Sequence, residues 1–116
     1  MILINGRFLS QRITGIQRFA YEICYALHQI GVEFVILAPI DINKEYDIKE
    51  LRVEVIGGKG SHYWEQVTLP KYVKSHYNGL LLLSLSGLSP LCYPNNIMTI
   101  HDISYKLRPR AYSWFY

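Results

Sequence analysis

The sequence is poor in the features that mark secreted, metal-binding or membrane-spanning proteins. Its 116 residues include only two cysteines, Cys24 and Cys92, and no CxxC spacing. This pattern argues against a disulfide framework or a cysteine metal site and favours two reduced thiols in a cytosolic protein. The first residues lack the charged start and apolar run of a secretory signal. Apolar runs such as Leu80–Leu83 are far too short to span a bilayer.

Charge is also scarce. Charged residues make up 18% of the chain, hydrophobic residues make up 50%, and the net charge is +3. These values are typical of an ordered globular protein, and the length predicts one domain over residues 1–116. The weak positive charge gives no reason to expect a nucleic-acid partner. The basic stretch Lys106–Arg110 is compatible with peripheral contact with an anionic membrane face and equally with a solvated loop.

The apolar pattern predicts strands that alternate with helices. Apolar residues from Ile16 to Ile30 recur with helical spacing, after a Thr14–Gln17 pair that has the spacing of a capping box. Gly31 follows at the position where the end of this helix is expected. Residues 61–77 are also helical in spacing, so we expect Pro70 either to break the helix at Leu69 or to lie in the first turn of a second helix. Five apolar or alternating runs predict strands: Met1–Ile4, Val32–Pro39, Leu51–Gly58, Gly79–Ser84 and Ile97–Asp102.

This order of elements indicates an α/β fold. Strands that alternate with helical segments, without hairpin turns, predict a Rossmann-like parallel sheet with helices on both faces. Ligands of such sheets bind outside the carboxyl ends of the strands. Residues 5–15, 84–96 and 101–110 fall at those ends and are therefore the functional candidates.

The turn Thr14-Gly15 is the first candidate site. A helix N-terminus offers unpaired N–H groups and a partial positive charge, and glycine lets a ligand approach the backbone. Arg7, Arg12 and Arg18 could add positive charge. The alternative is that Thr14 only caps the helix and the arginines are solvated. The dinucleotide fingerprint GxGxxG is not present at this turn.

Other motifs carry weaker signals. The stretch IGGKGS (residues 56–61) is rich in glycine, but its order and spacing do not match a P-loop. His62 and Glu65 lie one helical turn apart, yet no second pair with matching spacing follows, so we expect no metal. His101 and Asp102 end the last predicted strand, where a histidine can contact a substrate hydroxyl or phosphate, or simply hydrogen-bond a loop.

Taken in order, several stretches resemble the N-terminal half of family 4 glycosyltransferases with the GT-B architecture. The stretches are INGR, TGIQRFAYEI, HYWEQVTLP, LLSLSGLSPL, MTIHDISY and PRAYSWF, and together they cover nearly the whole chain. Each stretch alone is weak evidence, and the resemblance rests on the whole set in this order.

The resemblance implies a retaining glycosyltransferase that moves a sugar from a nucleotide-sugar to a glycan or lipid-linked acceptor, with no metal and no other cofactor. In that family the N-terminal domain mainly binds the acceptor. By the same resemblance, His101 would contact the transferred sugar, with Asp102 beside it. Thr14, Gly15 and Arg18 would form the loop near the donor diphosphate, supported by Arg7 and Arg12.

The family's donor-binding motifs belong to a C-terminal domain that would follow Tyr116. We therefore expect that residues 1–116 form an incomplete acceptor-side domain, inactive alone, of a cytoplasmic enzyme of polysaccharide biosynthesis. The alternative is a non-catalytic Rossmann-like module for binding or interaction. A third alternative, half of a nucleotide-dependent oxidoreductase, lacks the expected GxGxxG.

Overall fold

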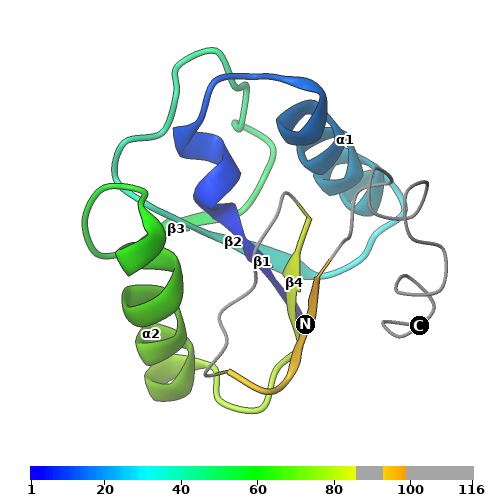
Figure 1. The fold of residues 1–116 in the computed structure, drawn as a ribbon. Coiled ribbons are helices and arrows are strands. Elements are labelled where there is room, and N and C mark those ends of the chain that lie inside the picture. The colour runs from blue at the N-terminus through cyan, green and yellow to red at the C-terminus, as the bar shows by residue number, and fades with distance from the viewer. Residues whose placement is uncertain (86–92, 99–116) are drawn as a thin grey trace, which may run out of the picture.

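The computed structural model describes residues 1–85 and 93–98, which form a five-stranded sheet with helices on both faces (Figure 1). All neighbouring strands are parallel, in the order β3-β2-β1-β4-β5. The predicted α/β class and parallel sheet are confirmed. The elements are β1 (Ile2–Asn5), the 3-10 helix η1 (Gly6–Ser10), α1 (Gly15–Gln29), β2 (Phe34–Ala38), β3 (Val53–Val55), the π-helix η2 (Trp64–Thr68), α2 (Leu69–His76), β4 (Leu82–Ser84) and β5 (Asn96–Met98).

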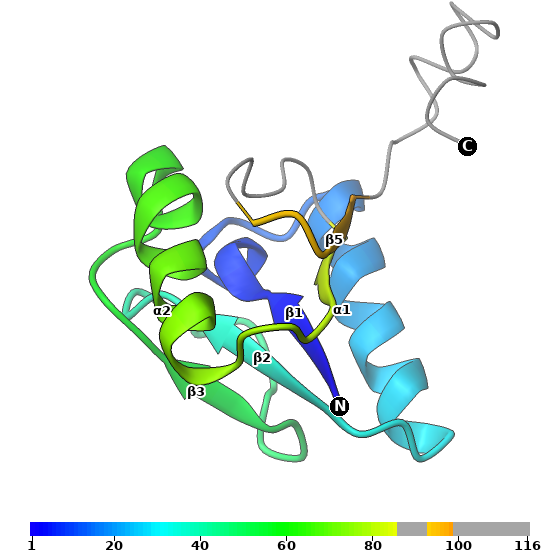
Figure 2. The same ribbon diagram turned by 90° about the horizontal axis from the view of Figure 1, so that it is seen from below.

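The helices α1 and α2 cover opposite faces of the sheet (Figure 2). Successive side chains of a strand point to opposite faces, and both faces are covered, so β2 is apolar at every position and β1 is apolar up to its last residue, Asn5. In β1, Ile4 packs into the core on the α1 side, with Ala20 and Cys24. Leu3 packs into the core on the α2 side, with Trp64. The sheet therefore separates two hydrophobic cores.

The helix α1 begins and ends where its sequence predicts. Thr14 is its N-cap, and the Thr14 backbone N–H donates to the Gln17 side chain over 3.3 Å. Gly31 follows the last turn with a φ of +84°, a left-handed conformation that glycine adopts without strain. The expected buried stripe is only partly correct, because Ile16 is 40% exposed and Ile30 is 74% exposed. Tyr21 packs against the core on the α1 side together with Ile23 of the apolar stripe.

Pro70 lies in the first turn of α2, which confirms one of the two alternatives for this segment. The chain does not break before it, because η2 runs directly into α2 with helical backbone angles at Thr68 and Leu69. Proline has no N–H, and its ring clashes with the carbonyl group four residues earlier in a regular α-helix. The wider π turn before Pro70 accommodates this ring without ending the helix.

The remaining strands are shorter than their sequence patterns suggest. Of the predicted strand Leu51–Gly58, only Val53–Val55 pairs with β2, and the predicted strand Gly79–Ser84 is reduced to Leu82–Ser84. The last predicted strand overlaps β5 only at Ile97 and Met98, and its other residues lie outside the described part of the chain.

Gly6 is the point where η1 passes closest to the sheet. A Cβ atom there would lie 2.5 Å from the Leu37 carbonyl oxygen and 2.7 Å from the Ile36 Cγ2 atom. Both neighbours are held in the central strand β2, so neither can move away freely. The segment that leads from β1 to α1 therefore requires glycine at position 6.

We predict that Gly6→Ala lowers the free energy of unfolding in urea by about 1–3 kcal/mol, because the new methyl group overpacks a rigid site. Gly58→Ala is the matched control, since a Cβ there meets nothing within 4 Å. The control is expected to stay within about 0.5 kcal/mol of the wild type. Equal stability of the two variants would contradict the close approach of Gly6 to β2.

A carboxylate on the edge strand β3 joins the sheet to α2. The Tyr72 hydroxyl donates to Glu54 Oε1 over 2.9 Å, and the Tyr77 hydroxyl donates to Glu54 Oε2. These hydrogen bonds, followed by desolvation, raise the pKa of both tyrosines above the ordinary value of 10.0. Ionisation of either phenol would place a second negative charge beside Glu54.

A raised pKa in the folded state stabilises the fold below pH 10.0, and this contribution is lost as the pH rises through the folded-state pKa. We therefore predict that Tyr72 and Tyr77 ionise above pH 10.0 in an absorbance titration and that stability declines over the same range. Glu54→Gln should move both tyrosines back toward the ordinary pKa. An unchanged titration curve in that variant would disprove the assigned cause.

Candidate functional site

The sheet order places a topological switch point between β1 and β4. The chain leaves β1 toward β2 on one side, whereas β4 continues to β5 on the other. In open parallel sheets, ligands bind outside the carboxyl ends of the two strands at this point. Asn5 ends β1 and Ser84 ends β4, so two polar side chains mark the position.

A buried polar network occupies this carboxyl edge. Asn5 Nδ2 donates to Glu65 Oε2 over 2.8 Å and to Ser84 Oγ over 3.1 Å. Arg7 Nη1 donates to Glu65 Oε1 over 3.0 Å, and the Arg7 backbone N–H donates to Asn5 Oδ1 over 3.2 Å. The four residues, here called the switch-point network, are Asn5, Arg7, Glu65 and Ser84.

Local structure explains why these side chains meet. Asn5 follows Leu3 by two positions, so it points to the same face of the sheet, the α2 side. The register Leu3↔Leu82 likewise directs Ser84 to that face. Glu65 belongs to η2, the π-helical segment, and contacts Asn5 from that helix. Single π turns are frequent at functional sites.

Burial gives the network its electrostatic character. Asn5, Glu65 and Ser84 are each less than 5% exposed, whereas the Arg7 side chain is 19% exposed. Burying a carboxylate without a partner is costly, and both oxygens of Glu65 are satisfied, one by Arg7 and one by Asn5. The network is therefore close to neutral as a unit, and the Arg7 guanidinium is the member that reaches the surface.

The predicted anion loop lies on the same edge of the sheet, at the start of α1. Thr14, Gly15, Arg12 and Arg18 are exposed, and Gly15 has no atom within 4 Å of a Cβ position. The structure thus leaves Gly15 accessible, and it places Arg12 and Arg18 without an ion pair among the described residues. Arg7 differs from this group, because its guanidinium is paired with Glu65.

The other predicted site residues lie outside the described residues. His101 and Asp102 belong to the range 99–116, and the loop after β4 is described only up to Leu85. Their assignment stays a prediction.

Sequence reasoning missed three members of the network. Asn5 and Ser84 fell inside the candidate ranges 5–15 and 84–96 but were not named as site residues, and Glu65 was considered only with His62 as half of a metal site. In the structure His62 is exposed, whereas the Glu65 carboxylate is directed at Asn5 and Arg7. No group of three possible metal ligands occurs among the described residues. The usable signal was a glutamate at an inward position of an otherwise apolar helix face.

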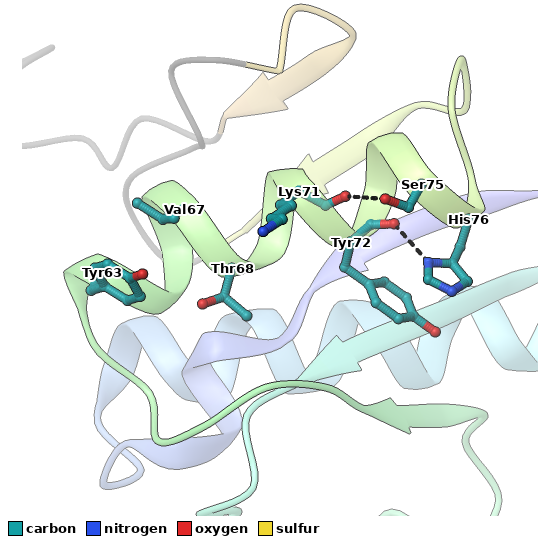
Figure 3. Close-up of a pocket in the computed structure, with 7 residues that line it drawn as sticks. All are labelled: Tyr63, Val67, Thr68, Lys71, Tyr72, Ser75 and His76. Carbon is teal, nitrogen blue, oxygen red and sulfur yellow. Dashed lines mark hydrogen bonds between the residues drawn. The ribbon is translucent and has the colours of Figure 1, made fainter.

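A separate groove of about 390 Å³ follows the outer side of α2 (Figure 3). Tyr72 and His76 stack along it, with ring centroids 4.1 Å apart. Its lining residues are Tyr63, Val67, Thr68, Lys71, Tyr72, Ser75 and His76. They all come from one helical segment, and none of them belongs to the switch-point network.

Searches of protein-family models, curated proteins and solved structures return no match to this chain. Within residues 1–85 and 93–98, no helix has the length and apolar character needed to cross a bilayer. The function of the site must therefore be inferred from the geometry of its residues.

We predict that Arg7→Ala destabilises the protein by about 2–3 kcal/mol, because it leaves the buried Glu65 carboxylate without its charge partner. The partial exposure of Arg7 places this value below that of a fully buried pair. Arg18→Ala, which removes an exposed arginine, should change stability by less than about 0.5 kcal/mol. Urea unfolding of both variants measures the difference, and equal losses would refute a stabilising Arg7–Glu65 pair.

Proposed function

We propose that this chain forms the acceptor-side, Rossmann-like half of a retaining glycosyltransferase that uses a nucleotide-sugar donor and a glycan or lipid-linked acceptor. The observation that carries the proposal is the arrangement at the carboxyl edge. The accessible Gly15 turn and the polar switch-point network lie at the edge where parallel sheets bind ligands. The ordered motifs of the sequence supply the reaction class.

In this proposal Arg12 and Arg18, which have no ion pair among the described residues, and the α1 N-terminus face the donor diphosphate. Developing negative charge on a leaving diphosphate is stabilised by fixed positive charge and by backbone N–H groups. Arg12, Arg18 and the first turn of α1 offer both. His101 contacts the transferred sugar, and a second Rossmann-like domain supplies the rest of the donor site. A cytoplasmic location at the inner membrane face belongs to the same proposal.

The test uses the full-length enzyme with a panel of nucleotide-sugars. His101→Ala should reduce turnover by orders of magnitude and leave the unfolding midpoint unchanged. A fully active variant would disprove the assignment of His101.

Gly15→Ala tests the loop separately. Because its Cβ would meet no atom of the described residues within 4 Å, the variant should fold normally and raise the KM for the nucleotide-sugar. Gly58→Ala, an equally open glycine after β3, is the matched control and should leave the KM unchanged. Equal KM values for wild type and Gly15→Ala would remove Gly15 from the donor site.

A further inference from the structure

Three arginines lie between the end of β1 and the first turn of α1, and they differ in electrostatic state. Arg12 and Arg18 are exposed and have no ion pair among the described residues, whereas Arg7 Nη1 lies 3.0 Å from Glu65 Oε1. Glu65 is nearly inaccessible, with 5% of its side chain exposed. Charges this close, in a medium of low dielectric, cancel most of each other's field outside the pair.

An anion gains little binding free energy at Arg7, because its negative charge is attracted by the guanidinium and repelled by the Glu65 carboxylate behind it. The guanidinium nevertheless carries five N–H donors in a rigid fork, and only Nη1 is engaged by Glu65. The Arg7 side chain is 19% exposed, so the ion pair with Glu65 does not cover it completely. Oriented donors of this kind suit a neutral oxygen, such as a sugar hydroxyl, better than a phosphate.

The rest of the network fixes where those donors point. Glu65 is held on its other oxygen by Asn5 Nδ2 over 2.8 Å, and Asn5 accepts the Arg7 backbone N–H. Both ends of the Arg7 residue are thereby tied to the end of β1. In both ribbon views η1, which carries Arg7, lies between α1 and α2 at the carboxyl edge (Figures 1 and 2).

We propose that Glu65 is a positioning residue that makes Arg7 a charge-compensated hydrogen-bond donor for a neutral hydroxyl of the acceptor sugar, and that the diphosphate is bound without Arg7. This inference rests on the proposed glycosyl transfer and divides its site into two zones. The anion zone holds Arg12 and Arg18, and the neutral zone holds Arg7.

The first experiment uses the 116-residue chain and two probes, inorganic pyrophosphate and methyl hexosides, with the arginine Nε–H signals observed by NMR. Pyrophosphate should shift the signals of Arg12 and Arg18 and leave that of Arg7 in place. A methyl hexoside should shift Arg7. Movement of Arg7 with pyrophosphate, or with neither probe, would overturn the proposal.

The second experiment removes the compensating charge. Glu65→Gln should tighten pyrophosphate binding about tenfold, equivalent to about 1.4 kcal/mol, because Arg7 becomes a free cation. The matched control is Arg7→Gln combined with Glu65→Gln. It replaces the ion pair, which has no net charge, by two uncharged amides, and it should bind pyrophosphate as the wild type does. Unchanged pyrophosphate affinity in the folded single variant would show that Glu65 does not compensate Arg7.

The two proposals fail in different ways. Absence of transfer by the full-length enzyme with every nucleotide-sugar would disprove the proposed function. The pyrophosphate and hexoside titrations would still decide the state of Arg7, because they require no turnover.

Discussion

The amide of one residue, Asn5, holds together the segments that meet at the carboxyl edge. Its nitrogen donates both to Glu65 on η2 and to Ser84 at the end of β4, and its oxygen accepts a backbone N–H of η1. These contacts join parts of the chain up to 79 residues apart. Because Asn5 is only 3% exposed, each of these groups would lose a partner that water could not replace if the amide moved.

A network of this kind favours one arrangement of the surrounding elements more than it adds stability. Burying a carboxylate and a guanidinium costs solvation energy, and a well-packed apolar set can be as stable or more so. A misplaced helix, however, would leave Glu65 charged and unpaired in the interior. The apolar cores on the two faces of the sheet supply most of the driving force, since apolar burial is the dominant favourable term in folding. The network then sets the position of the η2–α2 helix over the sheet.

The sequence predicted the elements well because each depends on local signals. Continuous apolar runs identified β1 and β2, and the Thr14–Gln17 spacing and Gly31 marked both ends of α1. It did not predict the switch-point network, because the contact between Asn5 and Glu65 spans 60 residues and depends on the strand order. It also overstated how much of α1 is buried, since apolar spacing alone does not reveal that Ile16, Phe19 and Ile30 are exposed.

The π turn before Pro70 has a consequence for how this chain should be aligned with any relative. Such a turn is equivalent to one extra residue in an α-helix, and each residue of an α-helix advances the side-chain direction by about 100°. A relative with a regular α-helix here would be one residue shorter, and a gap would belong within residues 64–68 rather than in a loop. Such a relative would present a different side chain to Asn5. Comparative searches that forbid gaps inside helices would therefore misregister this segment and pair Glu65 with the wrong position.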